Sequence, residues 1–231
     1  MIIPGILNKN KEETLNDVLK VKDILKTIQI DVCDGVFVES LTWLPKEEDE
    51  LIDWQDIDYE FDLMVEDLNK YILIAAEMGA NKVIIHSREE EKINLAISLA
   101  RDLSLNIAIC SDVLNVSKFI DKVEGVQIMG IEHIGKQGQK IKENLKEEVA
   151  AISEIVEAYN KQRKTKEETM PNQKENDRDV YIQIDGGMNE KTILEFKSKS
   201  IKNFVVGSAL FKLKPTEILE DKISALIEAA K

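Results

Sequence analysis

Hydrophobic residues along the chain gather in eight short runs that alternate with longer amphipathic stretches. Most of these runs are continuously apolar and rich in Ile and Val, which is typical of strands covered on both faces in a parallel sheet. The pattern predicts one strand in each of residues 1–7, 27–32, 59–65, 82–87, 106–111, 126–131, 180–185 and 203–208.

Helical periodicity occupies several of the intervals between these runs. Apolar residues recur on one face within residues 90–103 and again within residues 142–160. The segment PTEILEDKISALIEAA is predicted to form a last helix that starts at Pro215. The connection after Val38 has the least regular pattern of all, so no clear helix is predicted there.

Eight strand–helix units in 231 residues favour one α/β domain, a (β/α)8 or TIM barrel that spans residues 1–231. An open doubly wound sheet is the alternative architecture. It is disfavoured because the first strand is followed by GILNKN rather than by a G-x-G-x-x-G turn.

Residues 161–179 break the alternation of strands and helices. Met170 is the only large apolar residue in this highly charged stretch. Such a composition predicts a mobile polar loop on the surface, at the end of the barrel where helices lead into strands. We therefore expect that the stretch bears no catalytic group and can be shortened with little loss of fold.

The composition narrows the class of protein. Hydrophobic residues make up 43% of the chain and charged residues 32%, as in a soluble globular protein. The apolar runs are far shorter than the roughly 20 residues of a membrane helix, and the start MIIPGILNKNKEE lacks a signal-peptide pattern. We expect a cytoplasmic protein with no membrane partner. The formal charge of −13 disfavours nucleic-acid binding but leaves room for a small anion held by backbone N–H groups.

Polar residues at the ends of the predicted strands are candidates for chemistry, because the strand ends of a TIM barrel carry the active site. Such acids also cap helices, and this alternative stays open for Asp34 and Asp112. The full set is Asn8, Gln29, Asp31, Asp34, Asp62, His86, Ser111, Asp112, Glu132, His133, Asp185 and Ser208.

Asp31 and Asp185 are the strongest candidates for catalytic groups. In IQIDVCDG the alternation of a strand places Gln29 and Asp31 on one side. An acid that points inward from a parallel strand is costly unless it is paired, bound to a metal or catalytic, and Asp185 ends its strand in the same way. Two carboxylates on opposite walls of one mouth suit proton transfer to and from the two faces of a carbon.

Two glycine-bearing turns follow the seventh and eighth predicted strands. Gly186 and Gly187 follow Asp185, and Gly207 and Ser208 occur in VVGSAL. TIM barrels commonly bind phosphate at this place through backbone N–H groups and a helix start. These four residues are the predicted phosphate cup.

The motifs IDVCDGVFV, DLMV, VIIH, IMGI…GKQGQK, IDGGMNEKT and NFVVGSALF occur in the order and spacing seen in ribulose-phosphate 3-epimerases, so the chain resembles this family from Pro4 to Phe211. The resemblance implies a ribulose-phosphate-binding barrel and a divalent metal. It also implies two aspartates, here Asp31 and Asp185, that invert C3 of a pentulose 5-phosphate through an enediolate. Conversion of ribulose 5-phosphate to xylulose 5-phosphate, a step of pentose phosphate metabolism, is the expected reaction, and a phosphorylated sugar is the expected partner.

The chain also departs from the family pattern. Gln29 and Asp62 stand where the family has two metal-binding histidines, and Gly5 replaces a substrate-contacting serine. Glu132 and His133 stand in place of Asn-Pro after the sixth strand, whereas the phosphate-side motifs are better kept.

The remaining candidate metal ligands are Asp31, Asp62 and Asp185. An all-oxygen set favours Mg²⁺ or Mn²⁺ over Zn²⁺ or Fe²⁺. Alternatively no metal binds, and repulsion among the three acids makes one of them take up a proton. His86 is expected to be a satisfied polar residue outside the metal set.

Two other functions compete with the epimerase. A lyase of the same barrel superfamily would carry Asp-x-Lys-x-x-Asp at the third strand, but this chain reads DLMVED, without the lysine. A non-catalytic sugar-phosphate-binding homologue that lost its metal site is the other alternative. A homo-oligomer is compatible with the sequence.

Overall fold

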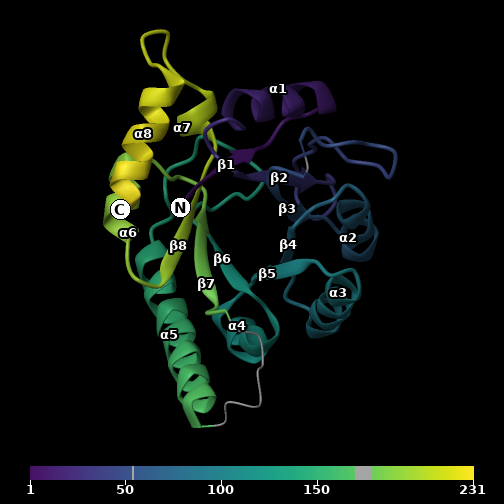
Figure 1. The fold of residues 1–231 in the computed structure, drawn as a ribbon, viewed down its shortest axis with the longest axis vertical. Helices are drawn as coiled ribbons and strands as arrows, with labels where there is room; N and C mark the ends of the chain where they lie inside the picture. Colours follow the sequence, from purple (N-terminus) through teal and green to yellow (C-terminus); the bar gives the residue numbers. More distant parts are fainter. Residues whose placement is uncertain (54, 170–177) are drawn as a thin grey trace.

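A computed structural model describes residues 1–53, 55–169 and 178–231, and in it the strands form a closed parallel barrel in the order β1 to β8 (Figure 1). All eight predicted strands and the (β/α)8 class are confirmed. The strands are β1 Ile2–Ile6, β2 Thr27–Cys33, β3 Asp58–Met64, β4 Lys82–His86, β5 Asn106–Cys110, β6 Gly125–Met129, β7 Tyr181–Asp185 and β8 Ile201–Val206.

Helices surround the barrel (Figure 1). Between β2 and β3 the described residues form no helix, in line with the irregular pattern after Val38. The helices are α1 Lys11–Val21, α2 Leu68–Glu77, α3 Glu90–Asp102, α4 Val113–Phe119, the 3-10 helix η1 Ile120–Lys122, α5 Leu145–Thr169, α6 Glu190–Phe196, α7 Ser208–Phe211 and α8 Leu219–Ala230.

The last helix starts later than predicted. Pro215 lies in a turn and not at the start of α8. The turn is closed by Glu217, whose backbone N–H donates to the Lys214 carbonyl at 2.9 Å while its carboxylate accepts from the Lys214 N–H at 2.7 Å. These contacts hold the chain in a turn before Leu219, so the proline marks the connection rather than the helix.

The prediction of a polar loop over residues 161–179 is wrong for residues 161–169, which continue helix α5. Lys, Gln, Arg and Glu are strong helix formers, so a polar composition does not prevent a helix. Residues 170–177 lie outside the described part of the chain, and the predicted mobility stays untested.

The end of α5 is also tied to the strand that follows. Arg163 is buried and pairs with Asp179 at 2.6 Å. Asn160 exchanges two hydrogen bonds with the Val180 backbone, at 2.8 and 2.9 Å. Shortening the whole of 161–179 would remove the Arg163–Asp179 pair, so the expected tolerance does not extend to these two residues.

Two environments lie on the two faces of the barrel wall. Ile28, Ile30 and Val32 of β2 belong to the hydrophobic core that the helices cover. Gln29 and Asp31 alternate with them and therefore point to the barrel interior. Within the described residues, no helix is long and apolar enough to cross a membrane.

The barrel interior holds a layer of polar side chains. Branched apolar residues usually fill a TIM-barrel interior. Here five buried polar residues lie on neighbouring strand positions, with Gln29 beside Glu60 and Gln183 beside both Gln127 and Asn203. We call Gln29, Glu60, Gln127, Gln183 and Asn203 the amide layer. It lies directly below the residues that end the strands.

Candidate active site

Three carboxylates meet above the amide layer. Asp31 and Asp62 are register partners on β2 and β3, and Asp185 ends β7. Their side chains are 8%, 0% and 9% exposed. One ligand atom from each lies within 4.8 Å of the other two, so the structure brings together the three acids predicted as metal ligands.

Gln29 joins two of these acids. Its side-chain nitrogen Nε2 donates to Asp31 Oδ1 at 2.9 Å and to Asp185 Oδ2 at 2.9 Å. The side chain of Gln29 is fully buried. An amide NH2 carries two hydrogens, so this one group satisfies one oxygen of each carboxylate.

Asp62 is held by different partners. His86 at the end of β4 places Nε2 2.6 Å from Asp62 Oδ1. Gln127 donates from Nε2 to Asp62 Oδ2 at 3.1 Å. Both oxygens of Asp62 therefore have a partner, and His86 is a satisfied polar residue as expected, although it touches the acid cluster directly.

Burial and mutual repulsion govern the charges of the site. Burial, followed by the charges of Asp185 and Asp62, raises the pKa of Asp31 well above its usual range. Burial and the charge of Asp62 raise the pKa of Asp185 to about 7. Burial alone would lower the pKa of His86, but the neighbouring Asp62 overcomes this and raises it. The cluster thus favours the protonated form of His86 and a retained proton on Asp31 or Asp185.

Sequence reasoning missed Glu60, Gln127, Gln183 and Asn203. Glu60, Gln127 and Gln183 lie inside apolar runs and Asn203 begins one, so none lies at the strand end that leads to the barrel mouth. The signal was present, because Glu60, Gln127 and Gln183 precede Asp62, Met129 and Asp185 by two residues, as Gln29 precedes Asp31. The alternation that places Gln29 inside the barrel also places these residues there.

The predicted phosphate cup lies beside the acids. Gly186, Gly187, Gly207 and Ser208 line one small cavity of about 40 Å³ together with Asp31 and Asp185. Gly186 and Gly187 have φ angles of +98° and +73°, which L side chains rarely adopt.

The segment after β6 covers this cup. A Cβ atom on Gly207 would lie 2.8 Å from Gln137 Nε2. On Gly186 and Gly187 it would lie 2.8 Å from Ile131 and from Ile141, respectively. A volume of about 40 Å³ holds little more than one water molecule. Ligand binding at the cup therefore requires the cover to move.

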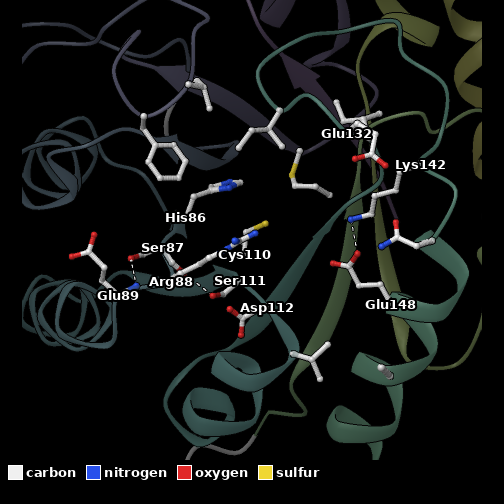
Figure 2. A pocket seen from close by; sticks show the side chains of 18 of the residues that line it. His86, Ser87, Arg88, Glu89, Cys110, Ser111, Asp112, Glu132, Lys142 and Glu148 are labelled. Atoms are coloured by element: carbon white, nitrogen blue, oxygen red, sulfur yellow. Dashed lines mark hydrogen bonds and ion pairs between the residues drawn. The ribbon is translucent and has the colours of Figure 1, made fainter.

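A much larger cavity of about 1470 Å³ opens on the side of β4, β5 and β6. Figure 2 shows His86, Arg88 and Cys110 on one side of it, facing the Lys142–Glu148 ion pair on the other. Met129 and Ile131 line both cavities, so the two adjoin. Pockets for drug-sized ligands measure about 300–1,000 Å³, so the space is ample for a sugar phosphate.

Two other predicted acids have structural roles. Asp112 caps helix α4 by accepting from the Asn115 N–H at 2.9 Å. Asp34 accepts from the backbone N–H groups of Val36, Phe37 and Glu66. The capping alternative is thus the correct one for Asp112, and Asp34 orders the loop after β2.

A divalent ion fits this donor set poorly. Mg²⁺ and Mn²⁺ need oxygen atoms free to bind them. The group between Asp31 and Asp185 is the N–H donor side of Gln29, and both oxygens of Asp62 already accept hydrogen bonds. The three acids are gathered as in a metal centre, but both oxygens of Asp62 and one oxygen each of Asp31 and Asp185 already accept hydrogen bonds from side chains.

Comparisons with known proteins give a consistent result. A family model described as the ribulose-phosphate 3 epimerase family matches residues 1–211. A ribulose-phosphate 3-epimerase from Aquifex aeolicus is 25% identical over 210 residues, which cover 88% of this chain and 85% of the relative. One from Helicobacter pylori is 23% identical over 198 residues, covering 83% and 82%.

Solved structures share the fold at low identity. A 3-keto-L-gulonate-6-phosphate decarboxylase from Vibrio cholerae matches with a TM-score of 0.61 and 13% identity, covering 100% of this chain and 96% of that one. A 3-hexulose-6-phosphate synthase matches with a TM-score of 0.65 and 13% identity, covering 100% of each chain.

Proposed function

Because the chain belongs to the ribulose-phosphate 3-epimerase family, we propose that it is a sugar-phosphate epimerase in which Asp31 and Asp185 are the acid and the base. One observation carries the proposal: both carboxylates line the same cavity as Gly186, Gly187, Gly207 and Ser208. A phosphate held by the cup would place the carbon chain of a sugar beside the two acids.

The reaction consists of two proton transfers at one carbon, one removing a proton and one delivering another. One aspartate removes the proton from C3 of ribulose 5-phosphate, and the electrons of the C–H bond move to the C2 carbonyl oxygen to give an enediolate. The other aspartate delivers a proton to the opposite face of C3. The carbonyl then re-forms, the product is xylulose 5-phosphate, and the protonation states of the two acids are exchanged.

The electrostatics support these roles. A carboxylate that accepts a proton and a carboxylic acid that donates one must be present together. The pKa values of Asp31 and Asp185 are both raised by burial, and repulsion opposes ionisation of the two groups at once. At neutral pH one group can therefore be ionised while the other keeps its proton.

The substrate class rests on the cup and on the adjoining cavity. Proteins of this family are named for ribulose phosphate, and both structural neighbours described above are named for a phosphorylated sugar or sugar acid. The cavity of about 1470 Å³ exceeds what a pentulose needs, so a longer sugar phosphate also fits the available space.

Ser208 tests the phosphate end of the site. We expect Ser208→Ala to weaken binding of inorganic phosphate and of ribulose 5-phosphate about tenfold, because a hydrogen bond to a charged group contributes roughly 1.5–3 kcal/mol. Isothermal titration calorimetry measures the change. Ser224→Ala is the matched control, since the Ser224 hydroxyl donates to the Glu220 carbonyl on helix α8, away from the cup. Equal affinities of Ser208→Ala and the wild type would show that the Ser208 hydroxyl does not bind the phosphate.

Solvent exchange tests the reaction itself. Ribulose 5-phosphate incubated with the protein in D₂O should gain deuterium at C3 and form xylulose 5-phosphate, both visible by NMR. Binding of the sugar phosphate without exchange, with or without added divalent metal, would favour the non-catalytic binding homologue instead. Loss of a carbon fragment from the sugar would indicate a lyase.

A further inference from the structure

We propose that the amide of Gln29 takes the place of a metal ion between Asp31 and Asp185, so that this pair acts without a resident divalent cation. The proposal rests on the function proposed above and adds how its two carboxylates are held. It concerns a residue that neither donates nor accepts the substrate proton, so Gln29 is a positioning residue.

Side chains of the amide layer determine which end of the Gln29 amide, nitrogen or oxygen, faces the acids. Lys82 pairs with Glu60, a buried carboxylate that can only accept hydrogen bonds when ionised. Gln183 Nε2 lies 3.2 Å from Glu60 Oε2 and therefore presents its NH2 group to that side. Asn203 Nδ2 donates to Gln183 Oε1 at 3.0 Å, which fixes the same orientation from the opposite end of the amide.

The orientation of the Gln183 amide determines that of the two glutamines nearer the acids. Its NH2 group lies 2.9 Å from Gln29 Oε1 and 2.9 Å from Gln127 Oε1. Both glutamines thus turn their oxygens down to Gln183 and their NH2 groups up to the acids. If the amide of Gln29 were reversed, its oxygen would face Asp31 and Asp185, and its NH2 group would face that of Gln183. The Gln183 amide therefore decides which atom of Gln29 meets the acid pair. Its two hydrogens serve the two oxygens at 2.9 Å, and the 3.2 Å contact with Glu60 Oε2 shares one of them.

The uncharged amide of Gln29 therefore lies between Asp31 and Asp185, where a metal ion would otherwise bind. Both hydrogens of the Gln29 NH2 group point to carboxylate oxygens at 2.9 Å, and a nitrogen with two hydrogens cannot bind a cation. Each oxygen of Asp62 already has a hydrogen-bond partner, His86 for Oδ1 and Gln127 for Oδ2, and both partners hold the carboxylate away from a metal role. These hydrogen bonds engage one oxygen of Asp31 and one of Asp185, and both acids line the cavity of the phosphate cup.

Titration with Mn²⁺ tests the proposal without measuring turnover. The full-length protein, stripped with a chelator, is titrated while the EPR signal of free Mn²⁺ is followed, and calorimetry gives the stoichiometry. Gln29→Glu replaces the NH2 group by an oxygen of nearly the same size, and Gln29→His provides an imidazole. Asp185→Asn in the wild-type background reports the Mn²⁺ that an acidic surface binds without a site.

We expect wild-type protein to bind no more Mn²⁺ than Asp185→Asn does. Gln29→Glu and Gln29→His should each gain one Mn²⁺ site whose affinity is at least about tenfold higher than that of the wild type, which is the scale of effect seen when the partners of a metal site change. If Gln29→Glu fails to fold, Gln29→His gives the answer. One Mn²⁺ per wild-type chain, lost in Asp185→Asn, would overturn the proposal. So would Gln29 variants that bind no better than the wild type. Deuterium exchange at C3 is measured separately, so failure of the epimerase proposal would be recognised independently.

Discussion

Replacing Asp185 or Asp31 by Asn is expected to reduce epimerisation by roughly 10²–10⁴-fold, because an amide cannot accept the substrate proton. Binding of ribulose 5-phosphate should change far less, since Gly186, Gly187 and the rest of the cup are untouched. Turnover is followed by NMR in D₂O, and binding by calorimetry on the same samples. The ratio of the two effects separates a catalytic role from a binding role.

Asp62→Asn is the comparison variant for this experiment, and it should lower turnover less, because Asp62 acts on Asp31 and Asp185 only through its charge. Asp62 is as deeply buried as the other two acids and belongs to the same cluster, but it does not line the cavity that Asp31 and Asp185 share. Its carboxylate is occupied by His86 and Gln127. A loss of turnover at Asp62→Asn as large as that at Asp185→Asn would contradict the assignment of acid and base.

The same Asp185→Asn change is expected to stabilise the folded protein at pH 8 by about 2–4 kcal/mol in the presence of a chelator. Each pKa unit corresponds to 1.36 kcal/mol, and burial beside Asp62 raises the pKa of Asp185 from 3.8 to about 7. The folded protein binds this proton more tightly than the unfolded chain does. Wild-type stability therefore falls as pH rises from about 4 to about 7, and the neutral amide removes that loss.

Chemical denaturation at pH 4 and pH 8 measures this effect. The advantage of Asp185→Asn should be large at pH 8 and nearly absent at pH 4. At pH 4 the wild-type carboxyl is protonated in most folded molecules and in a large fraction of unfolded ones, so little stability is lost to its ionisation. Asp34→Asn provides a control of opposite sign. Burial acts to raise the pKa of Asp34, but the N–H groups of Glu66, Phe37 and Val36 prevail and lower it, so this variant should lose stability at pH 8. Equal stability of Asp185→Asn and wild type at pH 8 would show that the carboxylate is not destabilised.

The strands and the acid pair could be predicted from sequence because their signals are local. A continuous apolar run marks a strand, and its end marks the mouth of the barrel, which is enough to find Asp31 and Asp185. Polarity misleads over residues 161–169, because it suggests a loop although the individual helix propensities of these residues are high. The burial of Arg163 depends on Asp179, a partner that composition does not reveal.

The amide layer could be suspected from strand alternation, but its hydrogen bonds could not be derived. Whether Gln29 turns its nitrogen or its oxygen to the acids depends on Gln183, which is 154 residues away in the sequence. The cover over the phosphate cup is a similar case, because the contact of Gln137 with Gly5 joins segments 132 residues apart. The sequence states which residue occupies each strand position. The orientation of an amide side chain depends on partners from several strands of the closed barrel.

The amide layer also bears on the order of events in folding. Its hydrogen bonds join β2 to β7, and β3 to β6 and β7, so they form only when distant parts of the chain have met around the barrel. Contacts of such long range incur the chain entropy of ring closure before they contribute any stability. Interactions that form after the transition state influence the rate of unfolding more than the rate of folding. We therefore expect the hydrogen bonds of the amide layer to slow unfolding of the closed barrel more than they change its rate of folding.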